Sequence, residues 1–177
     1  ISKNLNLDLK PVRQTGKHIL ICCQRNGGWS MGGLEVMDWL RQTVKRLHKF
    51  TDRPIVVRGH PGDKKAPGYL RLPKKWTNVR ISKNEHIQQD FKNCWAVITY
   101  NSSPGVAAAI EGIPVFVTDP VPEVSQAFDI CNTEIRKIER PRLPDRQRWI
   151  EKISMCHWNF DELKSGEAWR HMRRYIC

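Results

Sequence analysis

Continuous apolar runs alternate with amphipathic stretches in the first half of this chain. Residues 18–24 (HILICCQ) and 54–59 (PIVVRG) have the length and the unbroken apolar character of strands that are buried on both faces. Between them, residues 34–49 place apolar side chains at helical spacing and carry cations in the last turns, where cations suit the helix dipole. The pattern predicts a strand, a helix and a strand in this order.

A second pattern of the same kind occupies residues 95–119 (WAVITYNSSPGVAAAIEGIPVFVTD). A strand-like run at 96–100 ends in Asn-Ser-Ser-Pro-Gly, and an alanine-rich run follows as far as Glu111. Residues 114–117 are apolar again. This order predicts a strand, a loop, a short helix and another strand.

The ends of that short helix carry recognisable signals. We expect Ser103 to cap its start, because a serine hydroxyl can accept from the free N–H groups of the first turn, and Pro104 to take the first helical position. Gly112 suits the helix C-terminus. A helix that begins directly after a buried strand points its free N–H groups at the space above the sheet edge, where a phosphate can bind. The sequence therefore predicts an anion site with two serine hydroxyls beside it.

These two repeated units define the expected fold class. We predict an α/β fold with a Rossmann-like parallel sheet and helices on both faces, in a single domain. A short strand at 79–81 and a short helix at 84–94 join the two units, and further helices are expected at about 145–157 and 160–175. The expected organisation is an N-terminal arm (1–17), a Rossmann-like nucleotide-binding core (18–135) and a basic C-terminal helical extension (136–177).

The charge of the chain changes what partners are expected. Its 177 residues are enough for one domain with a hydrophobic core, and the net charge of +12 favours a polyanionic partner. Nucleic acid is the first candidate, and an anionic glycan or membrane surface is the second. A basic surface that only aids solubility is the alternative. The cations expected to contact phosphates are Lys64, Lys65, Arg71, Lys74, Lys75, Arg140, Arg142 and Arg146.

The six cysteines are widely scattered and form no C-x-x-C pair. This spacing favours reduced, mostly buried thiols over disulfides or a zinc site. The sequence shows no signal-peptide pattern and no apolar run of membrane-spanning length. We therefore expect a cytoplasmic protein without a membrane span, located in the host cytoplasm if the protein is viral.

Two of the seven tryptophans are candidates for stacking on bases. Trp29 and Trp76 lie in stretches with loop chemistry, where an exposed indole could stack. Trp39, Trp95 and Trp149 have the spacing of core residues instead.

Three unusual loops should meet at one edge of the predicted sheet. Residues 25–33 contain four glycines around Trp29, residues 59–63 contain His-Pro, and residues 101–105 contain the two serines. Each loop follows a predicted strand, and ligands of open α/β sheets bind beyond the carboxyl ends of the strands. The glycine spacing in 25–33 does not fit the dinucleotide fingerprint.

These loops resemble a known family. Arg58-Gly59-His60-Pro61 at the end of one strand and Asn101-Ser102-Ser103 before a helix resemble the HP and serine motifs of bacterial sialyltransferases and capsule-polysaccharide transferases. Residues 108–116 (AAIEGIPVF) resemble the helix end, glycine and proline-led strand of the nucleotide-binding half of GT-B glycosyltransferases. The resemblance covers about residues 18–119, and a single-domain relative of phage type would fit it.

The resemblance implies roles for individual residues. His60 would contact the phosphate of a nucleotide sugar and could act as an acid on the leaving group. Ser102 and Ser103 would bind that phosphate together with the helix N-terminus, and Glu111 would reach the ribose. His60 could instead be a turn residue, and Glu111 a solvated residue at the helix end. The remaining residues expected at the nucleotide are Gly27, Gly28, Asn101 and Gly105.

The expected ligand is a CMP-, UDP- or GDP-linked sugar, with no permanently bound cofactor and no metal. The related transferases have two Rossmann-like halves, and this chain has room for one. The base would then come from Asp63, Asp119, missing residues, a partner chain or the acceptor. One hypothesis is a transferase acting on a polyanionic acceptor such as the modified DNA of a bacteriophage. The alternative is a non-catalytic nucleic-acid-binding protein, or an assembly subunit, with the same fold.

Overall fold

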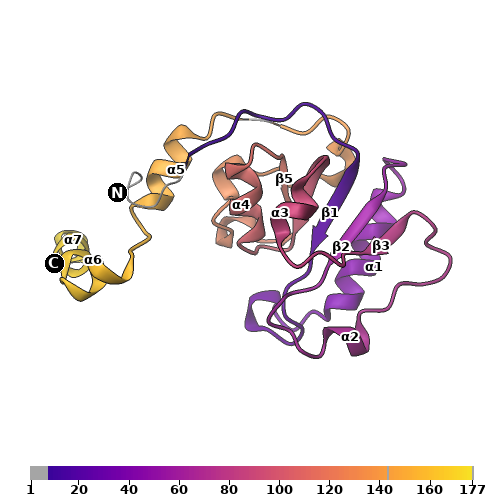
Figure 1. The fold of residues 1–177 in the computed structure, drawn as a ribbon, viewed down its shortest axis with the longest axis horizontal. Coiled ribbons are helices and arrows are strands. Elements are labelled where there is room, and N and C mark those ends of the chain that lie inside the picture. Colours follow the sequence, from indigo (N-terminus) through magenta and orange to yellow (C-terminus); the bar gives the residue numbers. More distant parts are fainter. Residues whose placement is uncertain (1–7, 143, 177) are drawn as a thin grey trace. The chain divides into compact units, whose positions relative to one another are not determined.

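The structure is a computed structural model in which residues 8–142 and 144–176 are described (Figure 1). The chain divides into two compact units. One is a sheet unit, Leu9–Pro144, and the other includes the helices that follow Asp145. In the C-terminal part of the chain the boundary between the units falls at Asp145. The sequence pattern placed the start of the C-terminal extension at residue 136.

The sheet unit contains five parallel strands in the order β3-β2-β1-β4-β5. Strand β1 is central, so that Ile19 pairs with Ile55 of β2 on one side and with Ala96 of β4 on the other. The strands are β1 (His18–Cys22), β2 (Ile55–Arg58), β3 (Val79–Ile81), β4 (Cys94–Thr99) and β5 (Val115–Val117).

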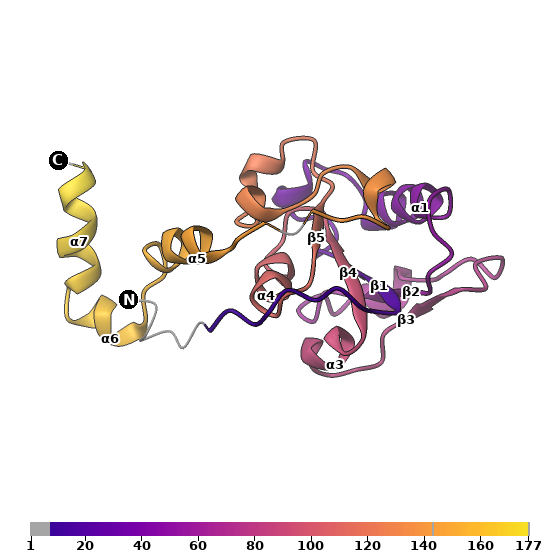
Figure 2. The ribbon, with the colours of Figure 1, turned by 90° about the horizontal axis from the view of Figure 1, so that it is seen from above.

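Both faces of this sheet are covered, which explains why the strands are apolar throughout. Alternate strand residues point to opposite faces, and Ile19 and Ile21 lie in one core cluster with Trp39 and Leu40 of helix α1 (Val36–Leu47). Helices α3 (Ile87–Phe91) and α4 (Pro104–Ile110) cover the other face (Figure 2). The predicted Rossmann-like parallel sheet with helices on both faces is therefore confirmed.

The remaining short elements of the sheet unit lie in the loops. Helix α3 is shorter than the predicted helix at 84–94. The carbonyls of Asn84 and Glu85 accept from Arg58 before the helix begins, and Asn93 has a φ of 56° just after it ends. The other elements are α2 (Ala66–Tyr69), η1 (Trp29–Met31), η2 (Pro122–Val124), η3 (Phe128–Ile130) and η4 (Ile135–Lys137).

The second unit contains helices α5 (Gln147–Ser154), α6 (Phe160–Lys164) and α7 (Glu167–Ile176). The single helix predicted at 160–175 is wrong, because Gly166 has a φ of 74° and the left-handed conformation ends α6. Asn159 and Glu162 form a reciprocal capping box at the start of α6.

The part of the N-terminal arm within the sheet unit is fastened to the sheet edge opposite the predicted site. The backbone N–H of Arg13 donates to the carbonyl of Gly112 at 2.8 Å, and that of Lys17 donates to the carbonyl of Asn93 at 2.6 Å. Gly112 follows the C-cap of α4 with a φ of 79°, as predicted for a helix C-terminus, and its ideal Cβ position lies 2.0 Å from the carbonyl oxygen of Pro11. Only glycine fits there.

The five cysteines that the structure describes are free thiols, four of them buried. Burial raises the pKa of Cys23 and of Cys94 to about 12, so these thiols stay protonated at neutral pH. Cys177 lies outside the described residues. None of the described helices combines the length and the apolar composition needed to cross a membrane.

Candidate functional site

A cavity of about 410 Å³ lies where the carboxyl ends of β1, β2 and β4 meet. Its lining includes Cys23 after β1, His60 after β2, and Ser102 and Ser103 after β4. The chain crosses from β3 to β4, on the other side of β1, so the cavity lies at the point where the strand order reverses. Open α/β sheets bind their ligands at such a point.

His60 belongs to a tight turn at the end of β2. Its Nδ1 accepts a hydrogen bond from the backbone N–H of Gly62 at 3.0 Å. A Cβ on Gly62 would lie only 3.1 Å from Cε1 of His60, so glycine permits this close approach. Because Nδ1 is an acceptor, the proton of the neutral ring is on Nε2, which can donate to a ligand. His60 is both a turn residue and a residue of the cavity.

The two serines differ in their surroundings. Ser103 directly precedes α4, but its φ of −58° and ψ of −24° are helical, and its side chain makes no capping hydrogen bond. The predicted side-chain cap is therefore wrong, because a capping hydroxyl needs extended backbone to reach the first-turn N–H groups. The Oγ of Ser102 is buried and, among the described residues, has no hydrogen-bond partner. A buried hydroxyl without a partner is costly and needs an explanation.

Asn101 and Gly105, which flank the serines in the chain, hold this segment in place. The side-chain amide of Asn101 donates to the carbonyl of Ser30 at 3.0 Å and to a carboxylate oxygen of Asp119 at 2.6 Å. Gly105 is buried, and a Cβ there would lie 3.1 Å from Cγ1 of Val115. These contacts hold residues 101–105 between the loop that follows β1 and strand β5. Asp119 is not among the residues that line the cavity.

Asp63 connects the loops that follow β1 and β2. Its carboxylate accepts from the hydroxyl of Tyr69 at 2.6 Å and from the backbone N–H groups of Asn26 and Lys65, each at 3.0 Å. The hydrogen bond from Tyr69, followed by that from Asn26, lowers the pKa of Asp63 below its ordinary value. Asp63 thus braces two loops. It does not line the cavity that contains Ser102, but it lines an adjoining cavity of about 410 Å³ together with His60 and Glu85.

Glu111 lies at the opposite end of α4 from Ser103, about 12 Å along the helix axis. Its carboxylate pairs with Nζ of Lys10 at 2.7 Å and with Arg13 at 3.7 Å. Glu111 is therefore not among the residues that line the cavity, and its contact with a ribose stays a prediction. Gly27 and Gly28 also lie outside the cavity lining.

The sequence pattern missed Glu85, His86 and Gln88, which line the cavity at the start of α3. They are held by Arg58, whose guanidinium donates to the carbonyl of Glu85 at 2.6 Å and to Asp90 at 2.7 Å. Asp90 is buried and also accepts from Ser82 and Asn84. No sequence signal marks this network, because Arg58 at the end of β2 lies far along the chain from its partners in the β3–α3 loop and in α3. Glu85 is the one carboxylate among the described residues that line this cavity.

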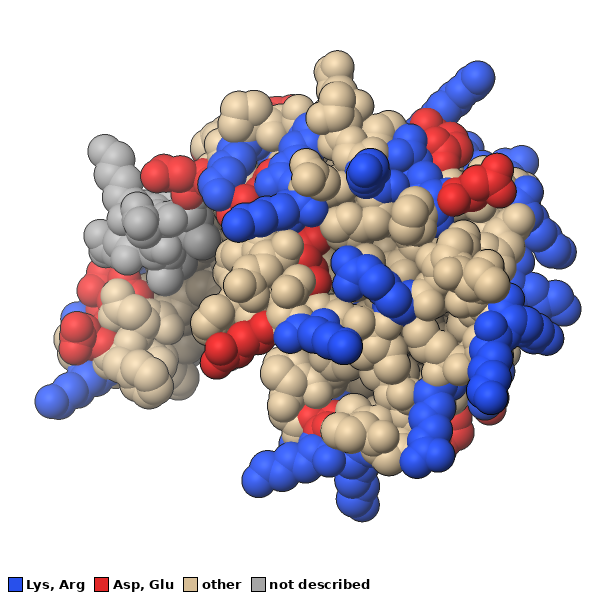
Figure 3. Space-filling model, turned by 45° about the vertical axis from the view of Figure 1, so that its right-hand side comes forward, with Lys and Arg blue, Asp and Glu red and all other residues tan. Residues whose placement is uncertain are grey.

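The predicted phosphate-contacting cations lie at several separate places. Lys64 and Lys65 line a smaller cavity of about 320 Å³ together with Arg25. The face in Figure 3 shows Lys and Arg projecting around its right-hand and lower rims, with few Asp or Glu between them. Arg146 belongs to the second unit. The other predicted cations, all exposed in the sheet unit, are Arg71, Lys74, Lys75, Arg140 and Arg142.

The tryptophans divide as the sequence predicted, with one exception. Trp29 is fully exposed, at 100% of its accessible surface, whereas Trp76 is half-buried and packs against the core. Trp39 and Trp149 are buried at 3%. Arg53 stacks over the ring of Trp95 at 4.0 Å. Trp29 is therefore the better placed of the two stacking candidates.

No protein-family model matches the chain, and no curated protein matches its sequence. Among solved structures, it is similar to KpsC, a beta Kdo 2,4 transferase of Thermosulfurimonas dismutans, with a TM-score of 0.50 and 20% identity. The match covers 75% of this chain and 44% of that chain. It is also similar to the glycosyltransferase SnogD from Streptomyces nogalater, with a TM-score of 0.41 and 13% identity over 83% of this chain and 45% of that chain.

The similarity to KpsC concerns the fold. The chain spans less than half the length of both of these structures. Its sheet unit has an α/β fold similar to part of that structure, consistent with one Rossmann-like half of a GT-B fold. The likeness to the HP and serine motifs of sialyltransferases stays a prediction from the sequence.

Proposed function

We propose that the cavity binds the phosphate and nucleoside of a nucleotide sugar, and that the chain provides the nucleotide-binding half of a glycosyltransferase. The observation that carries this proposal is the meeting of His60 and Ser102 in one cavity at the strand-order reversal. The cavity volume of about 410 Å³ lies in the range of small-molecule sites.

His60 and the two serines have the chemistry of a phosphate site. In the proposed complex, Nε2–H of His60 and the hydroxyls of Ser102 and Ser103 donate to phosphate oxygens. A bound phosphate gives the buried Oγ of Ser102 the partner that it lacks among the described residues. Donors aimed at the departing phosphate stabilise the charge that develops on it as the sugar leaves.

The geometry favours a hydrogen-bonding role for His60 over the acid role. An imidazolium carries a proton on each ring nitrogen, and a proton on Nδ1 would face the N–H of Gly62. With Nδ1 as the acceptor of this bond, Nε2–H is the ring group that can donate to the phosphate. Charge on the leaving phosphate would then be offset by hydrogen bonds.

In the proposed complex, Glu85 rather than Glu111 contacts the ribose. Glu85 lines the cavity, and a carboxylate can accept from two neighbouring hydroxyl groups, as a ribose presents them. Sugar transfer also needs a base for the acceptor hydroxyl. Because the carboxylates of Asp63 and Asp119 already accept hydrogen bonds from their own and neighbouring loops, we propose that a complementary half, from this protein or a partner chain, supplies the base.

A second candidate function is nucleic-acid binding without catalysis. It is favoured by the exposed lysines and arginines on the loops of the sheet unit, which outnumber the acids on the face in Figure 3. Phosphate contacts of this kind weaken steeply with salt, whereas nucleotide binding in a cavity depends on it less.

Calorimetric titration separates the two candidates. The ligands are CMP, CDP, UDP, GDP and a short DNA duplex, each at two salt concentrations. The proteins are the native chain, His60→Ala and the control His48→Ala, which removes an exposed histidine of the α1 C-cap. We expect one nucleotide to bind, with about tenfold weaker affinity in His60→Ala only. Salt-sensitive duplex binding without any nucleotide binding would reject the first function and support the second.

A further inference from the structure

The loops that follow β1 and β2 are joined into one surface. The backbone N–H of Asn26 donates to Asp63 at 3.0 Å, and the guanidinium of Arg25 donates to the carbonyl of Gly62 at 2.8 Å. These bonds bring the cations of the two loops to the rim of one cavity of about 320 Å³. The residues that line it are Arg25, Asn26, Gly62, Asp63, Lys64 and Lys65.

The charge in this smaller cavity is strongly positive. Its lining holds three cations, and its one acid, Asp63, already accepts three hydrogen bonds from Tyr69 and two backbone N–H groups. Within the described part of the chain, Arg25, Lys64 and Lys65 form no salt bridge. The cavity therefore suits an anionic group, which would accept charge-assisted hydrogen bonds from these side chains.

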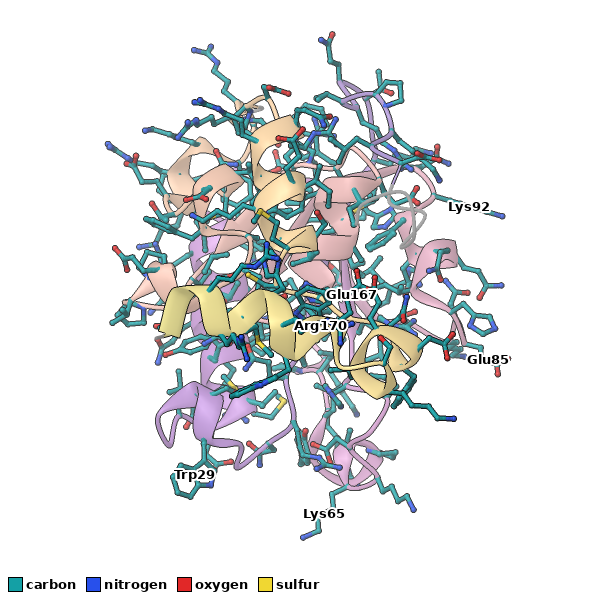
Figure 4. All side chains as sticks on the ribbon, turned by 90° about the vertical axis from the view of Figure 1, so that its left-hand side faces the viewer. Trp29, Lys65, Glu85, Lys92, Glu167 and Arg170 are labelled. Atoms are coloured by element: carbon teal, nitrogen blue, oxygen red, sulfur yellow. The ribbon has the colours of Figure 1, made fainter. Side chains whose placement is uncertain are left out.

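Trp29 stands on the same loop as Arg25. A turn closed by the bond from the N–H of Gly28 to the carbonyl of Arg25 leads directly to Trp29, which is fully exposed. The next residue, Ser30, is fixed by hydrogen bonds from the side chains of Gln24 at 2.7 Å and Asn101 at 3.0 Å. In Figure 4, Trp29 and Lys65 point outward at the same end of the molecule. An anchored loop thus presents a flat indole face to solvent, suited to stacking on a ring.

This surface adjoins the nucleotide cavity. A Cβ built on Gly62 would lie 3.1 Å from the ring of His60 and 3.8 Å from the guanidinium of Arg25. The two side chains therefore flank the same glycine, with His60 in the nucleotide cavity and Arg25 in the cationic one. A molecule held in the cationic cavity lies beside the place where the sugar would be released.

We propose that Arg25, Lys64, Lys65 and Trp29 form an acceptor subsite for an acidic sugar chain. The cations hold its carboxylate or phosphate groups, and Trp29 stacks on one of its rings. This proposal rests on the proposed transferase function and specifies the chemical class of the acceptor.

The tryptophans favour a sugar chain over a nucleic-acid strand. Strand-binding proteins stack successive bases on several exposed aromatic side chains. In the described sheet unit, Trp39 is buried and Trp76 and Trp95 are half-buried, so Trp29 is the one fully exposed tryptophan.

The test uses calorimetry on the full chain with four probes. Trigalacturonate supplies carboxylates, mannose 6-phosphate supplies a phosphate, maltotriose is a neutral control and a thymidine hexanucleotide represents nucleic acid. Lys64→Gln/Lys65→Gln removes two cations of the cavity. Lys74→Gln/Lys75→Gln removes two exposed lysines elsewhere and is the matched charge control. Trp29→Ala removes the stacking face.

We expect at least one acidic sugar to bind, and which one binds identifies the anionic group. Lys64→Gln/Lys65→Gln should lower the affinity for that sugar about tenfold. Lys74→Gln/Lys75→Gln should lower it by less than about twofold. Trp29→Ala should lower the affinity for trigalacturonate. The affinity for the nucleotide should be unchanged in all these variants. The subsite is rejected if neither acidic sugar binds, if the hexanucleotide binds in their place, or if the control pair loses as much. Failure of the native chain to bind any nucleotide would instead reject the proposed function, and the sugar titrations would still report on the subsite.

Discussion

The Nδ1 atom of His60 accepts a hydrogen bond from the backbone N–H of Gly62 at 3.0 Å. This one bond closes the turn after β2, sets the tautomer of the neutral ring and leaves Nε2–H as the atom that can reach a ligand. A feature that looks purely structural therefore also determines what His60 can do chemically.

Substitutions at His60 should distinguish the roles of its two ring nitrogens in nucleotide binding. A glutamine can place its amide donor near the position of Nε2, so His60→Gln should lose less than about threefold in nucleotide affinity, against about tenfold for His60→Ala. His60→Asn keeps an acceptor near the position of Nδ1 and should bind as weakly as His60→Ala. Calorimetry with the nucleotide that binds best measures this order. Tighter binding by His60→Asn than by His60→Gln would show that the turn, rather than the Nε2 donor, supports the ligand.

Ser102→Ala should weaken nucleotide binding without destabilising the free protein. The buried Oγ has no partner among the described residues, so its removal should leave the free energy of unfolding unchanged or raise it by up to about 1 kcal/mol. Urea unfolding and calorimetry measure the two effects. Ser103→Ala is the control for helix capping and should change stability by less than about 0.5 kcal/mol, because Ser103 makes no cap bond. A loss of stability in Ser102→Ala would indicate a structural partner for its hydroxyl.

The stability of the loops should depend on pH through Asp63. Hydrogen bonds from Tyr69 and Asn26 lower its folded-state pKa, so its stabilising contribution is complete above the ordinary value of 3.8 and is lost as the pH falls through the folded-state value. Asp63→Asn should therefore show a weaker loss of stability in acid than the native chain. Urea unfolding at several pH values between about 2 and 6 measures the slopes. Equal slopes in the two proteins would contradict this role.

Gly112→Ala should be strongly destabilising. A methyl group at Gly112 would meet the carbonyl oxygen of Pro11 at 2.0 Å, and its φ of 79° strains any other residue. We expect a loss of at least about 2 kcal/mol in urea unfolding, with release of the N-terminal arm as the alternative response. Gly68→Ala is the control, since a Cβ there meets no atom within 4 Å. Rapid hydrogen exchange at the Arg13 amide would identify arm release, and unchanged stability with a protected arm would contradict the clash.

Local patterns predicted the sheet well, because buried parallel strands and amphipathic helices are encoded by the period of their apolar residues. The same patterns placed helix α4 and the glycine that ends it. They failed where backbone geometry or distant partners decide the outcome. Ser103 has the residue type of an N-cap but helical dihedral angles, and Gly166 divides one predicted helix into two.

The sequence predicted part of the candidate site, namely the residues that directly follow the strands. His60 and Ser102 follow separate strands, and parallel topology alone brings the ends of such strands together. Glu85 could not be recognised in this way, because its position depends on Arg58 bonding to loop carbonyls and to the buried Asp90. Glu111 matched a motif but lies at the far end of its helix.

The sequence by itself determined the α/β class, the order of the strands and helices, and the residue types that end the strands. These depend on interactions within short segments. Tertiary structure alone decided that His60, Ser102 and Glu85 share a cavity, that Asp63 braces two loops, and that Arg25 joins Lys64 and Lys65 beside His60. Such placements depend on strand order and on hydrogen bonds between distant loops, which leave no periodic trace in the chain.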